Sequence, residues 1–361
     1  MRIFREILFK SPLYQAFRFF GYPKMLPLNY TFIISTHCNS RCLTCNIRKQ
    51  KHNELTLPEW KKIFQNLGTS PFWVTVAGGE PFLQKHLEEM IISLDQLCQP
   101  EIINIPTNSL LPGTIRKKLI KILKNIKTPQ LIVNLSLDGV GEIHDKVRGV
   151  PGNFNKVMQN YKNLKKIQKQ YSNLVVGFGT VISNYNIEHT KNVFDLVFKL
   201  EPDQYLTEIA EERVGLGTVG LPIAPSLVKY SRAVDYLIEK MKRYHFIGIG
   251  RISRAFRFEY YKFVKDWLAG KKLLPDYAGF ASCEVSSWGE VWPSCIKGEN
   301  MGNLRDVDYD FKKIWFSKKA DKIRKEIKKK GTSYPLANAF YSSAIYHRPT
   351  LIRVARRIIF P

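Results

Sequence analysis

Short apolar runs alternate with longer amphipathic stretches through much of the chain. The short runs are rich in β-branched and aromatic residues and predict strands, whereas the longer stretches place apolar residues at helical spacing. Strands and helices that follow one another in this way predict parallel β/α units. We expect strands at residues 30–35, 72–76, 101–106, 131–137, 174–182 and 204–210, and helices at 57–67, 86–97, 113–126, 154–170 and 187–200.

The predicted class is therefore α/β. Right-handed crossovers would curl the strands into a partial (β/α)6 TIM-like barrel with a small C-terminal extension. Functional side chains of such barrels lie at the C-terminal ends of the strands. We divide the chain into an amphipathic N-terminal helix (1–27), the core barrel (28–215), a helical segment (216–275), and an extension with a basic tail (276–361).

The charge of the chain is strongly basic. Lys and Arg number 56 against 31 Asp and Glu, a net charge of +25, and residues 311–361 hold 14 basic and two acidic residues. This excess favours an anionic partner, such as a membrane surface, a nucleic acid or an acidic substrate, but solvated helix faces would look the same. The first and last helices combine Arg and Lys with bulky apolar residues, which suits either a membrane interface or packing on the barrel.

The expected location is the cytoplasm, with peripheral contact at the inner membrane face. The first ten residues contain no uninterrupted apolar segment typical of a signal peptide. No run approaches the ~18 consecutive apolar residues that a transmembrane helix needs.

Three cysteines follow the first predicted strand directly. Cys38, Cys42 and Cys45 form a C-x3-C-x2-C motif, and three thiolates can hold three corners of a [4Fe–4S] cluster. The fourth iron would stay open to a substrate or cofactor, as a catalytic zinc keeps an open position. A structural zinc site completed by His37 or His52 is the alternative.

A second motif, Gly78-Gly79-Glu80-Pro81, ends the second predicted strand. Its glycines would let a ligand approach the backbone closely, and Glu80 supplies a carboxylate for an ammonium group. Together with the cysteine motif, in this order and spacing, it resembles the radical S-adenosylmethionine (SAM) superfamily. Weaker similarity continues at Asn108, at residues 136–139 and at 144–149. The resemblance covers residues 30–210, and more weakly 280–316.

The resemblance implies a function. Cys38, Cys42 and Cys45 would hold a cluster whose open iron binds SAM, and SAM would be cleaved reductively to a 5′-deoxyadenosyl radical that abstracts hydrogen from a substrate. A ferredoxin or flavodoxin would supply the electron. The SAM contacts that the resemblance implies are Thr44, Gly78, Gly79, Glu80, Asn108, Ser136 and Asp138. Asp138 could equally cap a helix.

Cys283 and Cys295 resemble the opening half of a SPASM or twitch extension, in which such cysteines bind an auxiliary iron–sulfur cluster. No cysteine follows Cys295, and two thiolates do not fill a four-thiolate site. Cys98 lies on a predicted helix, and we expect it to be a small buried hydrophobic residue. Two alternatives stay open: a second cluster, or a degenerate extension kept for its fold.

The sequence does not specify the substrate. The first hypothesis is a lipid-linked or envelope small molecule, consistent with basic amphipathic ends. The alternative is a peptide, as in maturases of ribosomally synthesised peptides. A third reading, from another class, is a non-catalytic iron–sulfur or zinc module that binds nucleic acid, although no recognition motif for nucleic acid is present.

Overall fold

The protein is built around one nine-stranded sheet. The computed structural model describes residues 2–243, 249–271, 274–331 and 333–359. The sheet has the order β6-β5-β4-β3-β2-β1-β7-β8-β9, in which β1 to β7 are parallel and β8 and β9 antiparallel. The strands are β1 (Asn29–Ile33), β2 (Trp73–Ala77), β3 (Ile102–Thr107), β4 (Gln130–Ser136), β5 (Leu174–Ile182), β6 (Gln204–Ile209), β7 (Ser282–Val285), β8 (Glu290–Trp292) and β9 (Gly302–Asn303).

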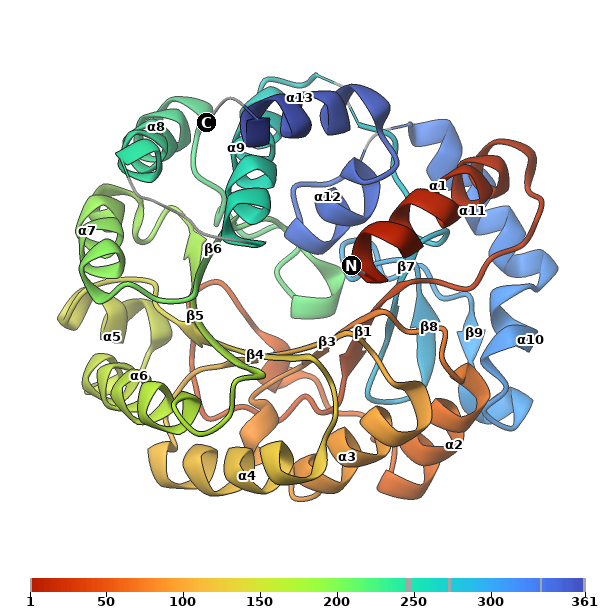
Figure 1. The fold of residues 1–361 in the computed structure, drawn as a ribbon, viewed down its shortest axis with the longest axis horizontal. Coiled ribbons are helices and arrows are strands. Elements are labelled where there is room, and N and C mark those ends of the chain that lie inside the picture. The colour runs from red at the N-terminus through yellow and green to blue at the C-terminus, as the bar shows by residue number, and fades with distance from the viewer. Residues whose placement is uncertain (1, 244–248, 272–273, 332, 360–361) are drawn as a thin grey trace.

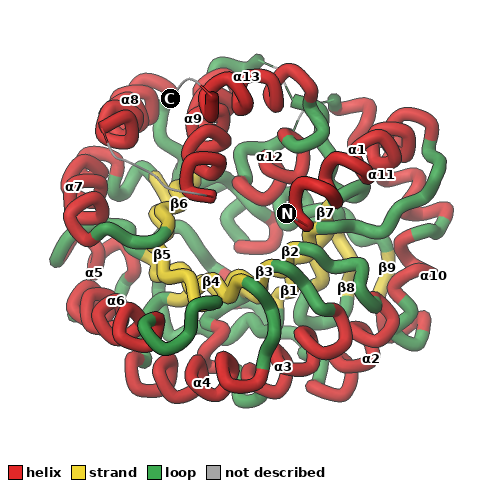
Figure 2. The backbone as a smooth tube through the Cα atoms, viewed as in Figure 1, coloured by secondary structure: helices red, strands yellow, loops and turns green. Residues whose placement is uncertain are grey.

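Helices cover the outer face of this curved sheet (Figures 1 and 2). The predicted partial barrel is thereby confirmed, and the six predicted strands and five predicted helices are present with small shifts of their ends. One short helix, α5, was not predicted. The barrel helices are α2 (Leu57–Leu67), α3 (Leu87–Cys98), α4 (Pro112–Asn125), α5 (Glu142–Arg148), α6 (Asn153–Gln168) and α7 (Thr190–Leu200).

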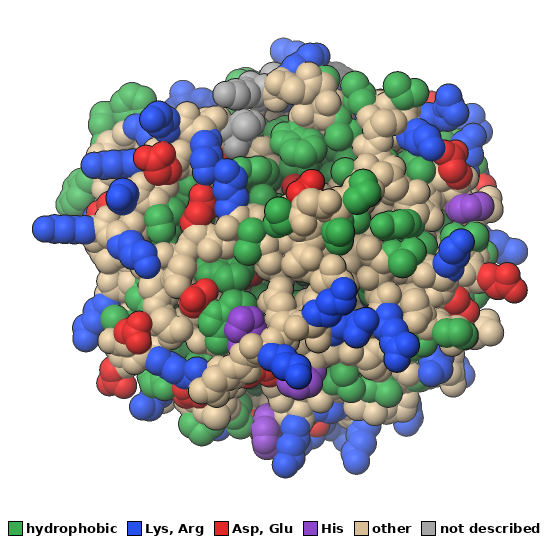
Figure 3. Space-filling model, turned by 180° about the vertical axis from the view of Figure 1, so that it is seen from behind, with side chains coloured by type: hydrophobic (Ala, Val, Ile, Leu, Met, Phe, Trp, Pro, Cys, Tyr) green, Lys and Arg blue, Asp and Glu red, His purple; other side chains and the backbone are tan. Residues whose placement is uncertain are grey.

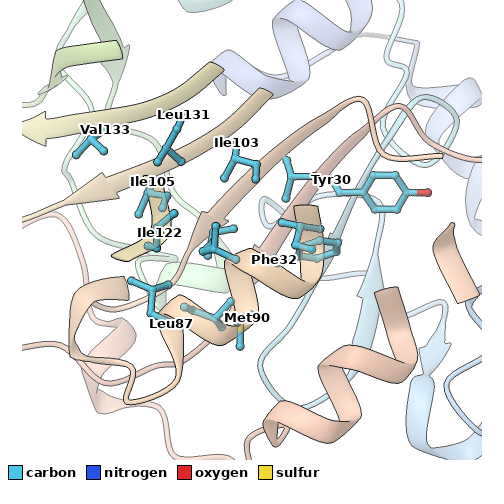
Figure 4. Close-up of a cluster of buried hydrophobic side chains, with 14 of the residues drawn as sticks. Tyr30, Phe32, Leu87, Met90, Ile103, Ile105, Ile122, Leu131 and Val133 are labelled. Atoms are coloured by element: carbon cyan, nitrogen blue, oxygen red, sulfur yellow. The ribbon is translucent and has the colours of Figure 1, made fainter. Parts of the chain in front are cut away.

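The main core lies between the strands and these helices. Alternate strand residues point to this side. Ile103 and Ile105 of β3 meet side chains of α3 and α4 (Figure 4), whereas Phe32 of β1 packs against Trp60 and Phe64 of α2 and Tyr30 lies against Phe311. Tyr30, Phe32, Ile103 and Ile105 are all fully buried. Burial of this apolar layer is the dominant stabilising contribution to the barrel.

The opposite face of the strands carries a row of polar side chains inside the barrel. Asn104 Nδ2 donates to Thr75 Oγ1 (3.4 Å), Asn134 Nδ2 donates to Asn104 Oδ1 (2.8 Å), and Gln204 Nε2 donates to Asn134 Oδ1 (2.9 Å). The last bond crosses β5 at Gly177, which pairs with both Asn134 and Gln204. A Cβ atom there would lie 2.5 Å from Asn134 Oδ1 and 2.6 Å from Gln204 Cγ.

We therefore expect Gly177→Ala to destabilise the barrel by about 1–3 kcal/mol, the usual cost of overpacking. Gly179 on the same strand has no atom within 4 Å of its built Cβ and is the matched control. Denaturant unfolding measures both variants. Equal unfolding free energies for Gly177→Ala and Gly179→Ala would contradict the role of this close approach.

The C-terminal third closes the open side of the barrel. Its helices are α8 (Leu227–Arg243), α9 (Ile249–Leu268), α10 (Phe311–Trp315), α11 (Lys318–Lys330), α12 (Ala337–Ala344) and α13 (Arg348–Ile359). Helix α12 reaches from β6 to β1: Ala337 N donates to Glu208 Oε1 (3.1 Å), and Asn338 Nδ2 donates to Thr31 Oγ1 (3.3 Å). This part of the chain, after Cys295, thus fills the opening of the barrel.

The basic segment that begins at residue 311 forms two helices, α10 and α11. Ser317 separates them because its Oγ accepts a hydrogen bond from Ala320 N (3.1 Å), which begins α11 as an N-cap. The face turned away from Figure 1 carries Lys and Arg across its whole extent with acidic groups between them (Figure 3). The excess of positive charge is therefore not gathered at one site on that face.

Arg305, after β9, attaches the extension to the barrel. Its guanidinium donates to Glu59 of α2 at 2.7 and 3.3 Å, and Tyr309 Oη donates to the same carboxylate (2.8 Å). The Arg305 hydrogen bond is the main reason that the pKa of Glu59 falls from 4.5 to about 2.

Because the folded pKa of Glu59 is lowered, this contact stabilises the protein above pH 4.5 and is lost as the pH falls toward 2. The full shift would correspond to about 3 kcal/mol, and solvent screening reduces our expectation to about 1–2 kcal/mol. Urea unfolding at pH 6 and pH 3 should show this loss in the wild type and less of it in Glu59→Gln. An identical pH dependence of the two proteins would contradict the assignment.

Helix α1 (Arg2–Phe20) and helix α13 lie at the two ends of the chain. Both pack on the body of the protein. The Tyr14 ring of α1 contacts the Tyr346 ring, with the ring centres 5.2 Å apart, and Arg353 and Arg357 of α13 pair with buried Glu259 of α9 at 2.6 and 3.2 Å. The side chains of α1 are described from Phe9 onward. Within the described ranges, no helix has the length and apolarity needed to cross a bilayer.

Candidate functional site

The three cysteines of the C-x3-C-x2-C motif line one cavity of about 260 Å3 at the C-terminal edge of the sheet. All three are free thiols. Their loop is docked on the end of α5, where Arg41 N donates to Arg148 O (3.0 Å) and Leu43 N donates to Val147 O (3.0 Å). Gly149 permits this contact, because a Cβ there would lie 2.3 Å from Arg41 O.

The two glycines of the second motif support the cysteine loop. A Cβ on Gly78 would lie 2.3 Å from Ser35 O, and one on Gly79 would lie 2.0 Å from His37 O. Gly79 N donates to Ser35 O (2.8 Å), and Glu80 N donates to His37 O (2.8 Å). The sequence suggested that the glycines make room for a ligand, but the atoms that crowd them belong to the backbone just before Cys38. Gly78 and Gly79 themselves also line the cavity.

Glu80 is the most enclosed carboxylate of the cavity wall, only 2% exposed. Its oxygens accept hydrogen bonds from Thr107 Oγ1 (2.8 Å), Phe82 N (3.1 Å) and Asn108 N (2.7 Å). Burial raises its pKa, and these donors oppose the rise. The carboxylate is thus fixed in position before any ligand binds.

Arg148 adds a guanidinium to the same wall, a role that the sequence did not indicate. Its Nη1 donates to Asp138 Oδ2 (3.1 Å), while its Nε is buried without a hydrogen-bond partner. The side chain lines the cavity beside Cys38 and Cys42. An unpaired buried donor is costly, and a ligand oxygen would satisfy it.

The remaining predicted SAM contacts fall into two groups. Thr44, Asn108 and Ser136 line the cavity. Asp138 is not among its lining residues, and its carboxylate is occupied by Arg148 and by Val181 N (2.8 Å). Asp138 therefore positions Arg148 instead of facing the cavity.

His144 is a structural residue of this region. It is fully buried, its Nδ1 accepts from Asp138 N (3.1 Å), and its Nε2 lies 3.1 Å from Asn153 Oδ1. Burial is the largest cause that lowers its pKa to about 4, so the imidazole is neutral near pH 7.

Glu211 and Arg213, just after β6, also line the cavity. Arg213 Nη2 lies 3.3 Å from Glu211 Oε1 and 3.4 Å from Glu208 Oε2, and its Nε is buried without a hydrogen-bond partner. Burial is the largest cause that raises the pKa of Glu211 to about 7. The rule that functional groups follow barrel strands could have found both residues, since they come directly after the last predicted strand.

The loop that carries Arg213 is tied to two other parts of the chain. Gly215 N donates to Cys295 O (2.9 Å), and Asn46 N, next to Cys45, donates to Leu216 O (2.9 Å). Asn46 Nδ2 also donates to Gly217 O (3.1 Å). The loop thereby connects the cysteine motif, the end of β6 and the extension.

Cys283 and Cys295 are not brought together. Cys283 packs in the main apolar core, whereas the next residue on β7, Glu284, interacts with the Cys295 thiol. Successive strand residues face opposite sides of a sheet, so Cys283 points away from Cys295. The auxiliary cluster inferred from this pair gains no support from their placement. Cys98 is fully buried in the core, as expected.

The zinc alternative also lacks its fourth ligand. His37 Nδ1 lies 3.1 Å from Ser35 Oγ and its side chain is 80% exposed, while the His52 ring stacks on Trp288 at 3.6 Å. In the part of the chain that the structure describes, no three His, Cys, Asp or Glu side chains are grouped around one metal-ion position.

Comparison with known proteins identifies a domain within the chain. Residues 32–197 match the model of the radical SAM superfamily. The chain is 26% identical over 220 residues to Fe-coproporphyrin III synthase of Methanosarcina barkeri, which covers 59% of this chain and 51% of that protein. It is 26% identical over 173 residues to the sporulation killing factor maturation protein SkfB of Bacillus subtilis, which covers 47% and 39%.

The fold is also similar to that of a solved structure. The chain superposes on Streptococcus suis SuiB bound to its precursor peptide SuiA with a TM-score of 0.57 and 18% identity, covering 83% of this chain and 67% of that one. The alignments span about half the length, or less, of the two curated relatives. The partial barrel, the cysteine loop and the matched region agree, and residues 32–197 form a radical SAM domain.

Proposed function

We propose that this protein is a radical SAM enzyme that modifies a peptide. Radical SAM chemistry is supported by the placement of three free thiols, the Glu80 carboxylate and the Arg148 guanidinium on the wall of one cavity. These groups match the two halves of the proposed ligand set: thiols for an iron–sulfur cluster, and opposite charges for an amino acid.

The donor set fits the cluster, because three thiolates leave one iron without a protein ligand. Cys38, Cys42 and Cys45 would hold it. When bound, a [4Fe–4S] cluster and SAM supply a one-electron cleavage that yields a 5′-deoxyadenosyl radical, with a ferredoxin or flavodoxin as the proposed electron donor. The six free cysteines agree with a reducing cytoplasm as the proposed location.

The chain's own residues position the SAM amino acid and shield the site. Glu80, held by three donors, offers its carboxylate to an ammonium group, and Arg148 offers its unpartnered Nε–H to a carboxylate. Both are oriented before binding, which reduces the entropic cost of fixing the ligand. Leu216, in the loop that is tied to Cys295 and Asn46, lines the cavity and would limit the entry of water.

Anaerobic reconstitution followed by reduction with dithionite tests the enzyme. We expect SAM to be converted to 5′-deoxyadenosine and methionine, slowly without substrate. Chromatography of the products measures both. A reconstituted, reduced protein that binds iron but leaves SAM intact would contradict the proposal and favour a non-catalytic iron–sulfur module.

A peptide substrate is supported by the wall formed by Glu211 and Arg213. The Arg213 Nε–H has no hydrogen-bond partner, and the Glu211 carboxylate lines the same cavity. One donor beside one acceptor matches the C=O and N–H of a peptide group. SuiB binds a precursor peptide and SkfB matures a killing factor, which favours this reading over the lipid-linked small molecule.

Deuterium transfer distinguishes the two substrate classes without knowledge of the substrate. The reconstituted enzyme is incubated with SAM and either a perdeuterated peptide pool or a perdeuterated lipid extract. We expect deuterium in 5′-deoxyadenosine, measured by mass spectrometry, only with the peptide pool. Label that comes from the lipid extract alone would restore the lipid-linked reading.

A further inference from the structure

The outward face of α1 is apolar and uncovered. Phe9, Leu13 and Phe20 follow one another at spacings that place them on one side of the helix. They are 70%, 40% and 78% exposed. Phe19 and Tyr22 extend this surface at the end of the helix, at 66% and 77% exposed. We call these five residues the aromatic face.

The inward face of the same helix is apolar as well. Tyr14 and Phe17 are each 1% exposed, and they pack against Tyr346 and Phe280. The expected amphipathic helix therefore has bulky apolar side chains on two sides, and only one side is covered by the protein. An exposed apolar patch of this kind marks an interaction surface.

A strongly basic helix flanks the aromatic face. Helices α1 and α11 lie side by side (Figure 1): Lys328 Nζ lies 5.0 Å from the centre of the Phe19 ring and donates to Phe19 O (2.7 Å). Lys322, Lys325 and Lys329 continue round the exposed side of α11. In the described part of the chain, none of these last three has an ion-pair partner.

We propose that the aromatic face and the exposed lysines of α11 form a docking surface for an anionic lipid bilayer. Aromatic side chains enter the interfacial zone of a membrane, and lysines beside them attract lipid phosphates. The pairing of apolar and cationic groups argues for a bilayer, since a purely electrostatic partner such as nucleic acid would leave Phe9 and Phe20 in water. This surface is independent of the cavity and of the proposed substrate.

Vesicle flotation of the full-length protein tests the proposal. We expect it to float with vesicles that contain phosphatidylglycerol at about 0.1 M salt, and to remain largely in the dense fraction with pure phosphatidylcholine. F9S/F20S should bind at least about tenfold more weakly. K322A/K325A/K329A should lose about fivefold per lysine, together with most of the salt dependence.

The matched control is V219S/V228S, which removes two exposed apolar side chains (63% and 68%) from elsewhere on the surface and should float like the wild type. Phe20→Trp gives a second readout: brominated lipid tails should quench its added fluorescence. The proposal is overturned if the wild type does not float with anionic vesicles, or if F9S/F20S floats equally well. A wild-type dimer that F9S/F20S converts to monomers would instead assign the aromatic face to a second copy of the chain.

Discussion

The triple variant C38A/C42A/C45A should contain almost no iron after anaerobic reconstitution. The wild type should hold about four irons per chain, as one cluster requires. The three thiols line the same cavity, and the remaining cysteines are placed where they do not complete a site with one another. Iron analysis measures the loss, and electron paramagnetic resonance of the reduced protein should show a SAM-sensitive signal in the wild type alone.

Two control variants separate this result from a general loss of structure. Cys98→Ala removes a buried thiol of the core and should keep about four irons. C283A/C295A should also keep them, because Cys283 and Cys295 lie on different sides of β7. Iron that persists in the triple variant, and that disappears only when Cys283 and Cys295 are also replaced, would establish the auxiliary cluster after all.

The part of the site that the sequence could predict follows from strand order. Cys38 and Glu80 stand directly after consecutive apolar runs, and the C-terminal ends of parallel strands meet at one edge of a sheet. Ser136 is the last residue of β4, so the same rule places it at this edge of the sheet. Local apolar patterns decide where a strand ends, so residues next to a strand end can be placed without knowledge of the tertiary structure.

The role of Arg148 could not be predicted in this way. It reaches the cavity because α5 docks on the cysteine loop through two backbone hydrogen bonds and the close approach at Gly149. Likewise, the position of Arg213 depends on a loop that hydrogen bonds from Gly215 N to Cys295 O and from Asn46 N to Leu216 O hold to distant segments. Such contacts join residues far apart in the chain and leave no periodic pattern in the sequence.

The strand register of the extension could not be predicted from the sequence either. Glu284 pairs with Trp292 across β7 and β8, which leaves Cys295 beyond the end of β8. A one-residue change of register moves every side chain of a strand to the other face of the sheet. Whether Cys283 faces Cys295 was therefore decided by pairing that the spacing of the two cysteines does not specify.

Glu80→Gln should weaken SAM binding while the cluster is retained. The substitution keeps the shape of the side chain but removes the charge that would face the SAM ammonium group. The loss of a hydrogen bond to a charged group costs about 1.5–3 kcal/mol, or about 10- to 100-fold in Kd. Equilibrium dialysis of SAM against the reconstituted variant measures this change, and iron analysis reports the cluster separately.

Glu54→Gln is a close control, because the Glu54 carboxylate, like that of Glu80, accepts three hydrogen bonds, from Ser35 Oγ, Thr36 N and Thr36 Oγ1. Its carboxylate is not among the groups that line the cavity. Both substitutions should therefore lower the unfolding free energy by about 1–3 kcal/mol, since each places an amide where donors need an acceptor. Only Glu80→Gln should raise the Kd for SAM. Equal affinities of the two variants would mean that Glu80 supports the loop of Asn108 and does not bind the ligand.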